Sequence, residues 1–162
     1  MDFNRQKITT YLWFDHQAEE AANFYTSLFE NSKILSLSRY GDAGPGPAGS
    51  VMTISFQLAG QEFIALNGGP QYKFSEAISL FVHCETQAEV DRLWERLTAE
   101  GEEGPCGWLK DKYGLSWQII PAGLGELLSN PDPEKSSRAV QAMLVMKKID
   151  LAKIRQAAAG DY

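Results

Sequence analysis

The fold of this chain follows from one stretch, CGWLKDKYGLSWQIIP at residues 106–121. Two runs in which polar residues alternate with heavy aromatic or aliphatic ones flank the turn residues Asp111–Gly114. This pattern predicts a β-hairpin. One face of the hairpin then lines either a packed core or a cup-shaped pocket, and the choice between the two is the functional question.

Upstream of the hairpin, the sequence predicts a strand and an amphipathic helix. The run from Ile78 to Cys84 has the composition of a strand, and Thr86 with Glu89 forms a capping box for the helix that follows. Gly101 is a suitable C-terminal cap. The apolar residues at helical spacing between these ends are Val90, Leu93, Trp94 and Leu97.

The first half of the chain has the same order of predicted elements. A strand-like run from Ile8 to Phe14 ends at Asp15, which we expect to cap a helix. A strand follows at residues 33–40, and a hairpin at 50–67 turns at Ala59-Gly60. The glycine- and proline-rich segment 41–49 between them cannot form regular structure and is expected to be a plain connection, although it is long enough to move over a pocket.

This common order of a strand, a capped helix and further strands in both halves indicates an internal repeat of βαβββ type. We expect an α+β protein with one module at residues 1–70 and a second at 71–122, forming one compact domain overall. Residues 123–162 are expected to add helices: a short one at 124–128, one capped by Asp132 with Pro133 at its first position, and one beginning at Asp150.

Composition narrows the classes of partner. The chain has 162 residues, 44% of them hydrophobic, and a net charge of −6. An acidic chain with dispersed basic residues is not expected to bind nucleic acid or an anionic membrane. No apolar run is long enough to span a bilayer and the N-terminus lacks the pattern of a signal peptide, so we expect a cytoplasmic protein with reduced cysteines.

Several pieces, taken in order, carry a family resemblance. They are YLWFDHQAEEAANFY, GSVMTISFQLAGQEFIALNGGP, SLFVHCETQAEVDRLWERL, CGWLKDKYGLSWQIIP and the tail PDPEKSSRAVQAMLVMKKIDLAKI. With them the chain resembles, from Ile8 to Ile154, the PhnB-like branch of the glyoxalase/bleomycin-resistance superfamily, a branch often labelled demethylubiquinone methyltransferase. The resemblance implies a glyoxalase/bleomycin-resistance fold in which two βαβββ modules form a curved-sheet cup. Enzymes of this vicinal oxygen chelate superfamily hold a divalent metal in the cup, whereas its resistance proteins bind a drug there without chemistry.

The metal-binding pattern of the superfamily falls on Thr10, Ala65, Ser79 and Gln118 in this chain. Only Gln118 is a usual oxygen donor, whereas hard divalent ions favour carboxylates and transition ions favour imidazoles. We therefore expect no metal and no cofactor. The methyltransferase label is also disfavoured, because the chain has neither the length nor the motif of a doubly wound nucleotide-binding sheet.

Two other groups of residues are candidates for chemistry. Cys84 and Cys106 are expected to be buried reduced thiols rather than a nucleophile or redox pair, because no neighbouring base or Cys-x-x-Cys spacing activates them. Asp111 with Lys112 is expected to be a structural turn rather than an acid–base pair.

The leading hypothesis is a metal-free protein that binds a small organic molecule and assembles as a homodimer. Two alternatives stay open: a superfamily enzyme (a lyase, isomerase or thiol-dependent transferase) with a metal held unusually by Gln118 and a histidine, and a dimeric structural subunit with a vestigial cup. The residues do not decide whether any reaction is catalysed. The residues expected to bind the ligand are Thr10, Trp13, Asn67, Ser79, Cys106, Trp108 and Gln118.

Overall fold

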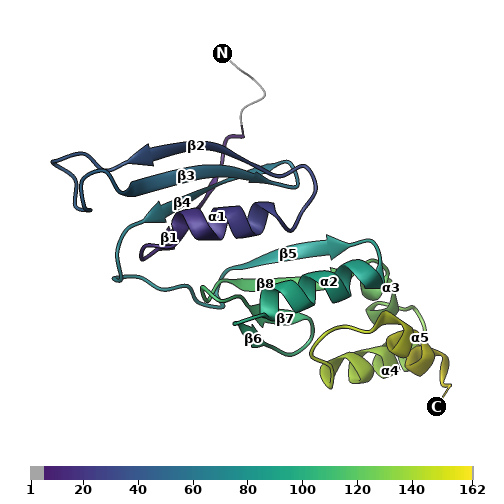
Figure 1. Cartoon of the computed structure of the whole chain (residues 1–162). Helices are drawn as coiled ribbons and strands as arrows, with labels where there is room; N and C mark the ends of the chain where they lie inside the picture. Colours follow the sequence, from purple (N-terminus) through teal and green to yellow (C-terminus); the bar gives the residue numbers. More distant parts are fainter. Residues whose placement is uncertain (1–5, 162) are drawn as a thin grey trace. The chain divides into compact units, whose positions relative to one another are not determined.

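The chain divides into two compact units, each built on its own four-stranded sheet (Figure 1). The computed structural model describes residues 6–161, and the first unit ends at Lys73 while the second begins at Phe74. Both units combine helices with mixed sheets, so the expected α+β class with C-terminal helices is confirmed. No helix within residues 6–161 is both long and apolar enough to cross a membrane.

The first unit has the strand order β1-β4-β3-β2, with β1 parallel to β4 and the other neighbours antiparallel. Helix α1 packs on one face of this sheet. Alternate strand residues such as Leu12, Phe56 and Ala65 point to that face and are buried. The elements are β1 (Thr10–Phe14), α1 (Ala18–Thr26), β2 (Lys33–Arg39), β3 (Val51–Leu58) and β4 (Gln61–Asn67).

The N-terminal cap of α1 differs from the one expected. The N-cap residue is Gln17, which makes no side-chain cap, and Asp15 lies outside the helix. The amide of Ala18 instead donates to Oδ1 of Asn67, 2.8 Å away at the end of β4. The expectation for Asp15 was wrong because a side chain remote in sequence already satisfies the helix terminus.

The connection at residues 41–49 is packed against one aromatic ring. Tyr40 is buried, and its hydroxyl donates to the carbonyl of Asn67 at 2.5 Å. A Cβ atom added at Gly44 or Gly46 would lie 2.8 or 2.4 Å from atoms of the Tyr40 ring. Glycine at these two positions therefore lets the loop backbone lie directly against the ring.

The second unit repeats the arrangement, with the strand order β5-β8-β7-β6 and β5 parallel to β8. Helix α2 packs on one face through Val90, Leu93, Trp94 and Leu97, as expected. Strand β6 has two residues. The elements are β5 (Ser79–Cys84), α2 (Gln87–Thr98), β6 (Glu102–Glu103), β7 (Trp108–Lys110) and β8 (Ser116–Pro121).

The capping box of α2 is confirmed with one change. The amide of Glu89 donates to Oγ1 of Thr86 at 3.1 Å, but the Glu89 carboxylate accepts from the amide of Glu85 at 2.8 Å. At the other end, Glu100 rather than Gly101 has the positive φ, at 62°. Gly101 is needed for space, since a Cβ there would lie 2.3 Å from the carbonyl oxygen of Lys110.

The central hairpin turns on a buried aspartate. Asp111 is 3% exposed, and its carboxylate accepts hydrogen bonds from the amides of Tyr113 (2.8 Å) and Leu115 (3.1 Å) and from Nε1 of Trp117 (2.9 Å). A buried charge is tolerated when several donors surround it. The structural assignment of Asp111 is confirmed, and the hairpin is the feature that positions β7 and β8.

Three helices complete the second unit: α3 (Leu124–Leu128), α4 (Pro133–Leu144) and α5 (Leu151–Ala159). Asp132 and Asp150 cap α4 and α5, as expected. The helices share a small apolar core, whose buried members are Leu124, Ala139, Ile149, Ile154 and Ala158.

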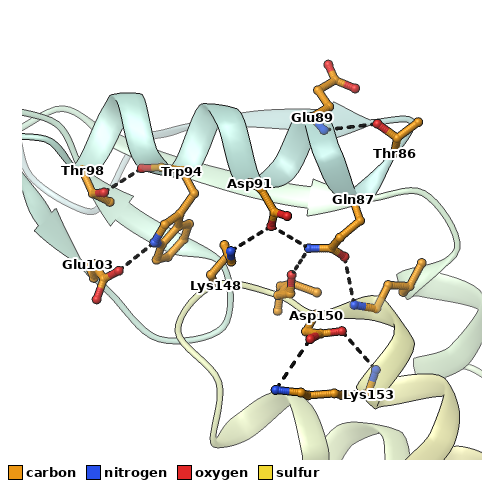
Figure 2. A network of polar contacts seen from close by, with 12 residues as sticks. Thr86, Gln87, Glu89, Asp91, Trp94, Thr98, Glu103, Lys148, Asp150 and Lys153 are labelled. Atoms are coloured by element: carbon orange, nitrogen blue, oxygen red, sulfur yellow. Dashed lines mark hydrogen bonds and ion pairs between the residues drawn. The ribbon is translucent and has the colours of Figure 1, made fainter.

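A polar network joins the segment before α5 to α2 (Figure 2). Gln87 donates to the carbonyl of Ile149 at 2.7 Å and accepts from the amide of Leu151 at 3.1 Å. Lys148 lies 2.8 Å from a carboxylate oxygen of Asp91. Close by in the chain, the carbonyls of residues 146 and 147 accept from the amides of residues 106 and 107. The C-terminal helices are thus anchored to the start of the central hairpin.

Replacing Asp111 tests the hairpin. We expect Asp111→Ala to lower the free energy of unfolding by about 3 kcal/mol or more, because it leaves three donors unsatisfied near the core. Asp111→Asn keeps one acceptor oxygen and is expected to cost less. Urea unfolding of both variants measures this, with Asp42→Ala on the exposed loop as the control. A loss no larger for Asp111→Ala than for the control would contradict the assignment.

Candidate functional site

The candidate site lies on the face of the second sheet opposite α2, which we call the open face. Strand register groups its side chains into rows that cross the sheet. The first row runs from β6 to β5 and contains Glu102, Lys110, Ser116 and Ser79. It begins with charged side chains and ends with hydroxyls.

The second row contains Trp108, Gln118 and Phe81. The Gln118 side-chain amide donates to Oγ of Ser79 at 2.9 Å, which links the two rows. Phe81 is 47% exposed and its ring lies 4.7 Å from that of His83, which belongs to the same face. An aromatic row therefore flanks a polar one.

A pocket of about 480 Å³ opens where these rows meet the β6–β7 edge. A volume of this size suits a small organic molecule. Most of its walls come from β6, β7 and the turn between them. The lining residues are Glu76, Glu102, Glu103, Gly104, Pro105, Trp108, Leu109, Lys110 and Ser116.

Ser116 is the unusual member of this lining. Its side chain is 1% exposed, yet its hydroxyl has no hydrogen-bond partner among the described residues. A buried hydroxyl without a partner costs about 1–3 kcal/mol, so native proteins contain few of them. Ser116 is one of the residues that line the pocket.

The charged side chains of the pocket are partly paired with each other. Lys110 lies 2.5 Å from the Glu76 carboxylate. The hydrogen bond and charge of each partner lower the pKa of Glu76 and raise the pKa of Lys110. The Glu103 carboxylate accepts from Nε1 of Trp94 at 2.8 Å, and this bond lowers the pKa of Glu103 (Figure 2).

Three of the residues predicted to bind ligand, Ser79, Trp108 and Gln118, share the open face. The structure thus brings these three together, and two of them are hydrogen-bonded to each other. Cys106 precedes β7 with a φ of 56°, and its thiol donates to the carbonyl of Met143 at 3.7 Å. Its side chain therefore points to the C-terminal helices.

Thr10 and Ala65 lie on the α1 side of the first sheet. Thr10 alternates with the buried Leu12, and Ala65 is fully buried beside it in β4. The assignment of Thr10 to a ligand site therefore stays a prediction. The side chains that face away from α1 at this point are those of the paired residues Tyr11 and Ile64.

Trp13 and Asn67 act as structural links at the ends of their strands. Nε1 of Trp13 donates to the carbonyl of Gly69 at 2.9 Å, and its ring meets that of Tyr72 edge-on at 5.0 Å. Asn67 caps α1 and donates to the carbonyl of Val51 at 3.2 Å. Asn67 also borders a second pocket, of about 580 Å³, whose walls are largely glycine and proline segments.

The donor set does not fit a catalytic metal. Ser79 and Gln118 offer one hydroxyl and one amide, already bonded to each other, while Thr10 and Ala65 point to the α1 side of their sheet. Within residues 6–161 no three histidine, cysteine or acidic side chains gather as a metal site. Neutral oxygen donors alone hold divalent ions poorly.

The cysteine prediction holds for Cys84, which is free and buried. Burial and, to a lesser degree, the Glu89 carboxylate raise the pKa of its thiol to about 12. A thiol with this pKa is not a nucleophile at neutral pH. Cys106 is free and half-buried.

The site residues predicted from sequence did not include Ser116, Lys110, Glu102 and Glu76. Ser116 is two positions from Gln118 on one strand, so strict alternation could have placed it on the same face. The positions of Glu102 and Glu76 depend on a two-residue strand and on an irregular segment. Neither the two-residue strand nor the irregular segment has a periodic pattern in the sequence.

Comparison with known proteins gives a consistent picture of the fold. A family model described as 3-demethylubiquinone-9 3-methyltransferase matches residues 6–120. A PhnB protein from Bacillus cereus is 45% identical, with 72% of this chain and 100% of that chain covered and a TM-score of 0.66. No curated protein matches.

Two further solved structures share the fold at lower identity. Protein PA1353 from Pseudomonas aeruginosa is 20% identical, with 72% of this chain and 98% of that one covered and a TM-score of 0.60. The fosfomycin resistance protein FosX from Listeria monocytogenes, in complex with Mn(II) and sulfate, is 18% identical, with 80% and 100% covered and a TM-score of 0.53. The family match ends before the C-terminal helices, although the sequence resemblance was expected to extend to Ile154.

The raised pKa of Cys84 predicts a loss of stability at high pH. Between about pH 9 and pH 12 the unfolded chain loses the thiol proton while the folded chain keeps it. The free energy of unfolding therefore falls as the pH rises, by about 1 kcal/mol per pH unit from this group. Urea unfolding at several alkaline pH values measures the slope. Cys84→Ala is expected to have a shallower slope, and identical slopes would contradict the prediction.

Proposed function

This chain belongs to the family described as 3-demethylubiquinone-9 3-methyltransferase, the PhnB-like branch of the glyoxalase/bleomycin-resistance superfamily, and we propose that it binds a small organic molecule without a metal. The binding site in this proposal is the pocket on the open face of the second unit. The seven residues expected from sequence contribute Ser79, Trp108 and Gln118 to this face, and Ser116 is added to them.

One observation carries the proposal: the buried, unpartnered hydroxyl of Ser116. Leaving it unsatisfied costs folding free energy, and a ligand that supplies a hydrogen bond recovers that cost. Trp108 borders the same pocket with a half-buried indole, which offers apolar area to a flat molecule. A polar group beside an apolar aromatic wall is the usual composition of a small-molecule site.

The methyltransferase description does not fit the architecture. Methyl transfer from a nucleotide-derived donor is typically carried out on a doubly wound parallel sheet with helices on both faces. In the part of the chain that the structure describes, each sheet has four strands with one parallel pair. The family name is therefore a description of relatives, and fold membership alone does not assign an activity.

The second candidate is a superfamily enzyme with an unusual metal. One observation favours it, because Gln118 and His83 lie on the same face of the second sheet. Two neutral donors are fewer than a resident ion needs. We therefore place this enzyme second, and the assembly role with a vestigial cup third. The homodimer and the cytoplasmic location expected from the sequence stay proposals, the first testable by sedimentation equilibrium.

Replacing Ser116 separates binding from stability. Ser116→Ala removes the unsatisfied hydroxyl, so we expect the free energy of unfolding to rise by about 1 kcal/mol. Any ligand found by screening flat organic molecules on ¹⁵N-labelled protein should bind Ser116→Ala about tenfold more weakly, because a hydrogen bond is lost. The NMR resonance of the Trp108 indole N–H, assigned by its loss in Trp108→Phe, shows whether a ligand binds at this pocket.

Ser137→Ala is the matched control for this experiment. Ser137 is an exposed serine on α4, remote from the pocket lining, and its replacement is expected to change neither quantity. The proposal would be contradicted by ligands that never shift the Trp108 indole, or by equal affinity for Ser116→Ala and the parent chain.

Metal analysis tests the second candidate. We expect protein purified without chelator or affinity tag to contain far less than one divalent ion per chain. We also expect Mn²⁺, Zn²⁺ and Mg²⁺ to leave the melting temperature unchanged, because an ion that binds only the folded state would raise it. A near-stoichiometric ion together with a rise in melting temperature would instead support the metal enzyme. Gln118→Ala should then abolish both.

A further inference from the structure

We propose that the pocket selects a flat organic cation, a protonated amine or amidinium carried on an aromatic ring, with Glu102 as the residue that recognises its charge. This inference rests on the proposed small-molecule function and names the class of ligand. It follows from the charges that face the pocket, from the indole beside them and from the buried hydroxyl of Ser116, which lines the same pocket.

The charges of the side chains on the open face do not sum to zero. Glu76 and Lys110 form an ion pair with 2.5 Å between the carboxylate oxygen and Nζ, so their charges offset each other. Glu102 is directly opposite Lys110 across the β6–β7 pair and therefore lies on the same face. The Glu102 carboxylate also interacts electrostatically with Lys110, so the two carboxylates and the one ammonium group together leave one negative charge at the pocket.

The neighbouring carboxylate is committed elsewhere. Glu103 alternates with Glu102 on β6 and turns toward α2, where it accepts from Nε1 of Trp94 at 2.8 Å (Figure 2). Lys147 from the segment after α4 lies 3.6 Å from the other Glu103 oxygen. Glu103 is thus held and partly neutralised, and Glu102 is the acidic group that remains for a ligand.

The rest of the lining defines the body of the ligand. Glu102, Gly104 and Trp108 all line the pocket. The amide of Gly104 donates to the Trp108 carbonyl at 2.8 Å, which pairs the end of β6 with the start of β7. An indole next to a carboxylate is a favourable place for a flat cation, because the ring attracts positive charge and buries apolar area. Ser116, one row position from Lys110, supplies a hydrogen bond to a polar substituent of the ring.

Three probes of nearly the same shape test the charge preference: benzamidine, benzamide and benzoate. Each has a benzene ring with a small planar head group, and the charges are positive, neutral and negative at pH 7. We expect benzamidine to bind at least tenfold more tightly than benzamide, and benzoate more weakly than either. Titrations followed at the Trp108 indole resonance measure the affinities, and added salt should weaken only benzamidine.

Variants at neighbouring positions assign the preference to Glu102. Glu102→Gln should reduce benzamidine affinity to the level of benzamide and leave benzamide unchanged. Glu95→Gln is the matched control, since it removes the same charge from an exposed position on α2 outside the pocket lining, and it should change neither affinity. Lys110→Met releases the Glu76 carboxylate and is expected to strengthen benzamidine binding.

The outcomes distinguish this inference from the function on which it rests. Absent benzamidine binding, equal affinities, tighter benzoate binding, or a preference that survives Glu102→Gln would each overturn the cation assignment. Neutral or anionic molecules that still shift the Trp108 indole would then leave the proposed binding function standing. If no molecule in the broader screen shifts that resonance, the binding function itself fails.

Discussion

The second unit depends on the three hydrogen bonds accepted by the Asp111 carboxylate. Two of them close the turn of the β7–β8 hairpin, and the third fixes the Trp117 indole on the helix side of the sheet. Because strand residues alternate between faces, fixing Trp117 toward α2 also fixes Ser116 and Gln118 toward the open face. A buried charge in a turn thus determines which side chains border the pocket.

The pocket lining is charged because the side chains of β6 and β7 that face it differ from those that face α2. Glu103 and Leu109 face α2 and belong to the core side, while Glu102 and Lys110 face the other way. The edge strand carries two adjacent carboxylates, and alternation gives one of them a structural role and leaves the other exposed. The same alternation separates the buried Trp117 from the half-buried Trp108.

Much of this arrangement could be predicted from sequence, because it depends on local patterns. Helix periodicity, the cap at Thr86, and the turn at Asp111 are each encoded within a few residues, and the structure confirms them. Errors arose where distant residues decide the outcome. Asn67 caps α1 from the end of β4, 49 residues further along the chain, and the face of the sheet on which Thr10 lies depends on the pairing of β1 with β4. The pocket chemistry of Glu102 could not be predicted, because it depends on pairings across the sheet.

The anchoring of the C-terminal helices has a consequence for where this fold can be cut. The family match ends at residue 120, yet the amides of Cys106 and Gly107 are satisfied by carbonyls of residues 146 and 147, and Gln87 on α2 is satisfied by the backbone around Ile149. A chain shortened at the family boundary would leave these donors to water and expose Ile120, which packs against the core of the C-terminal helices. The folding unit is therefore longer than the segment that the family model matches. Recombination or domain-fusion work on this protein should place its junctions after α5 rather than after β8.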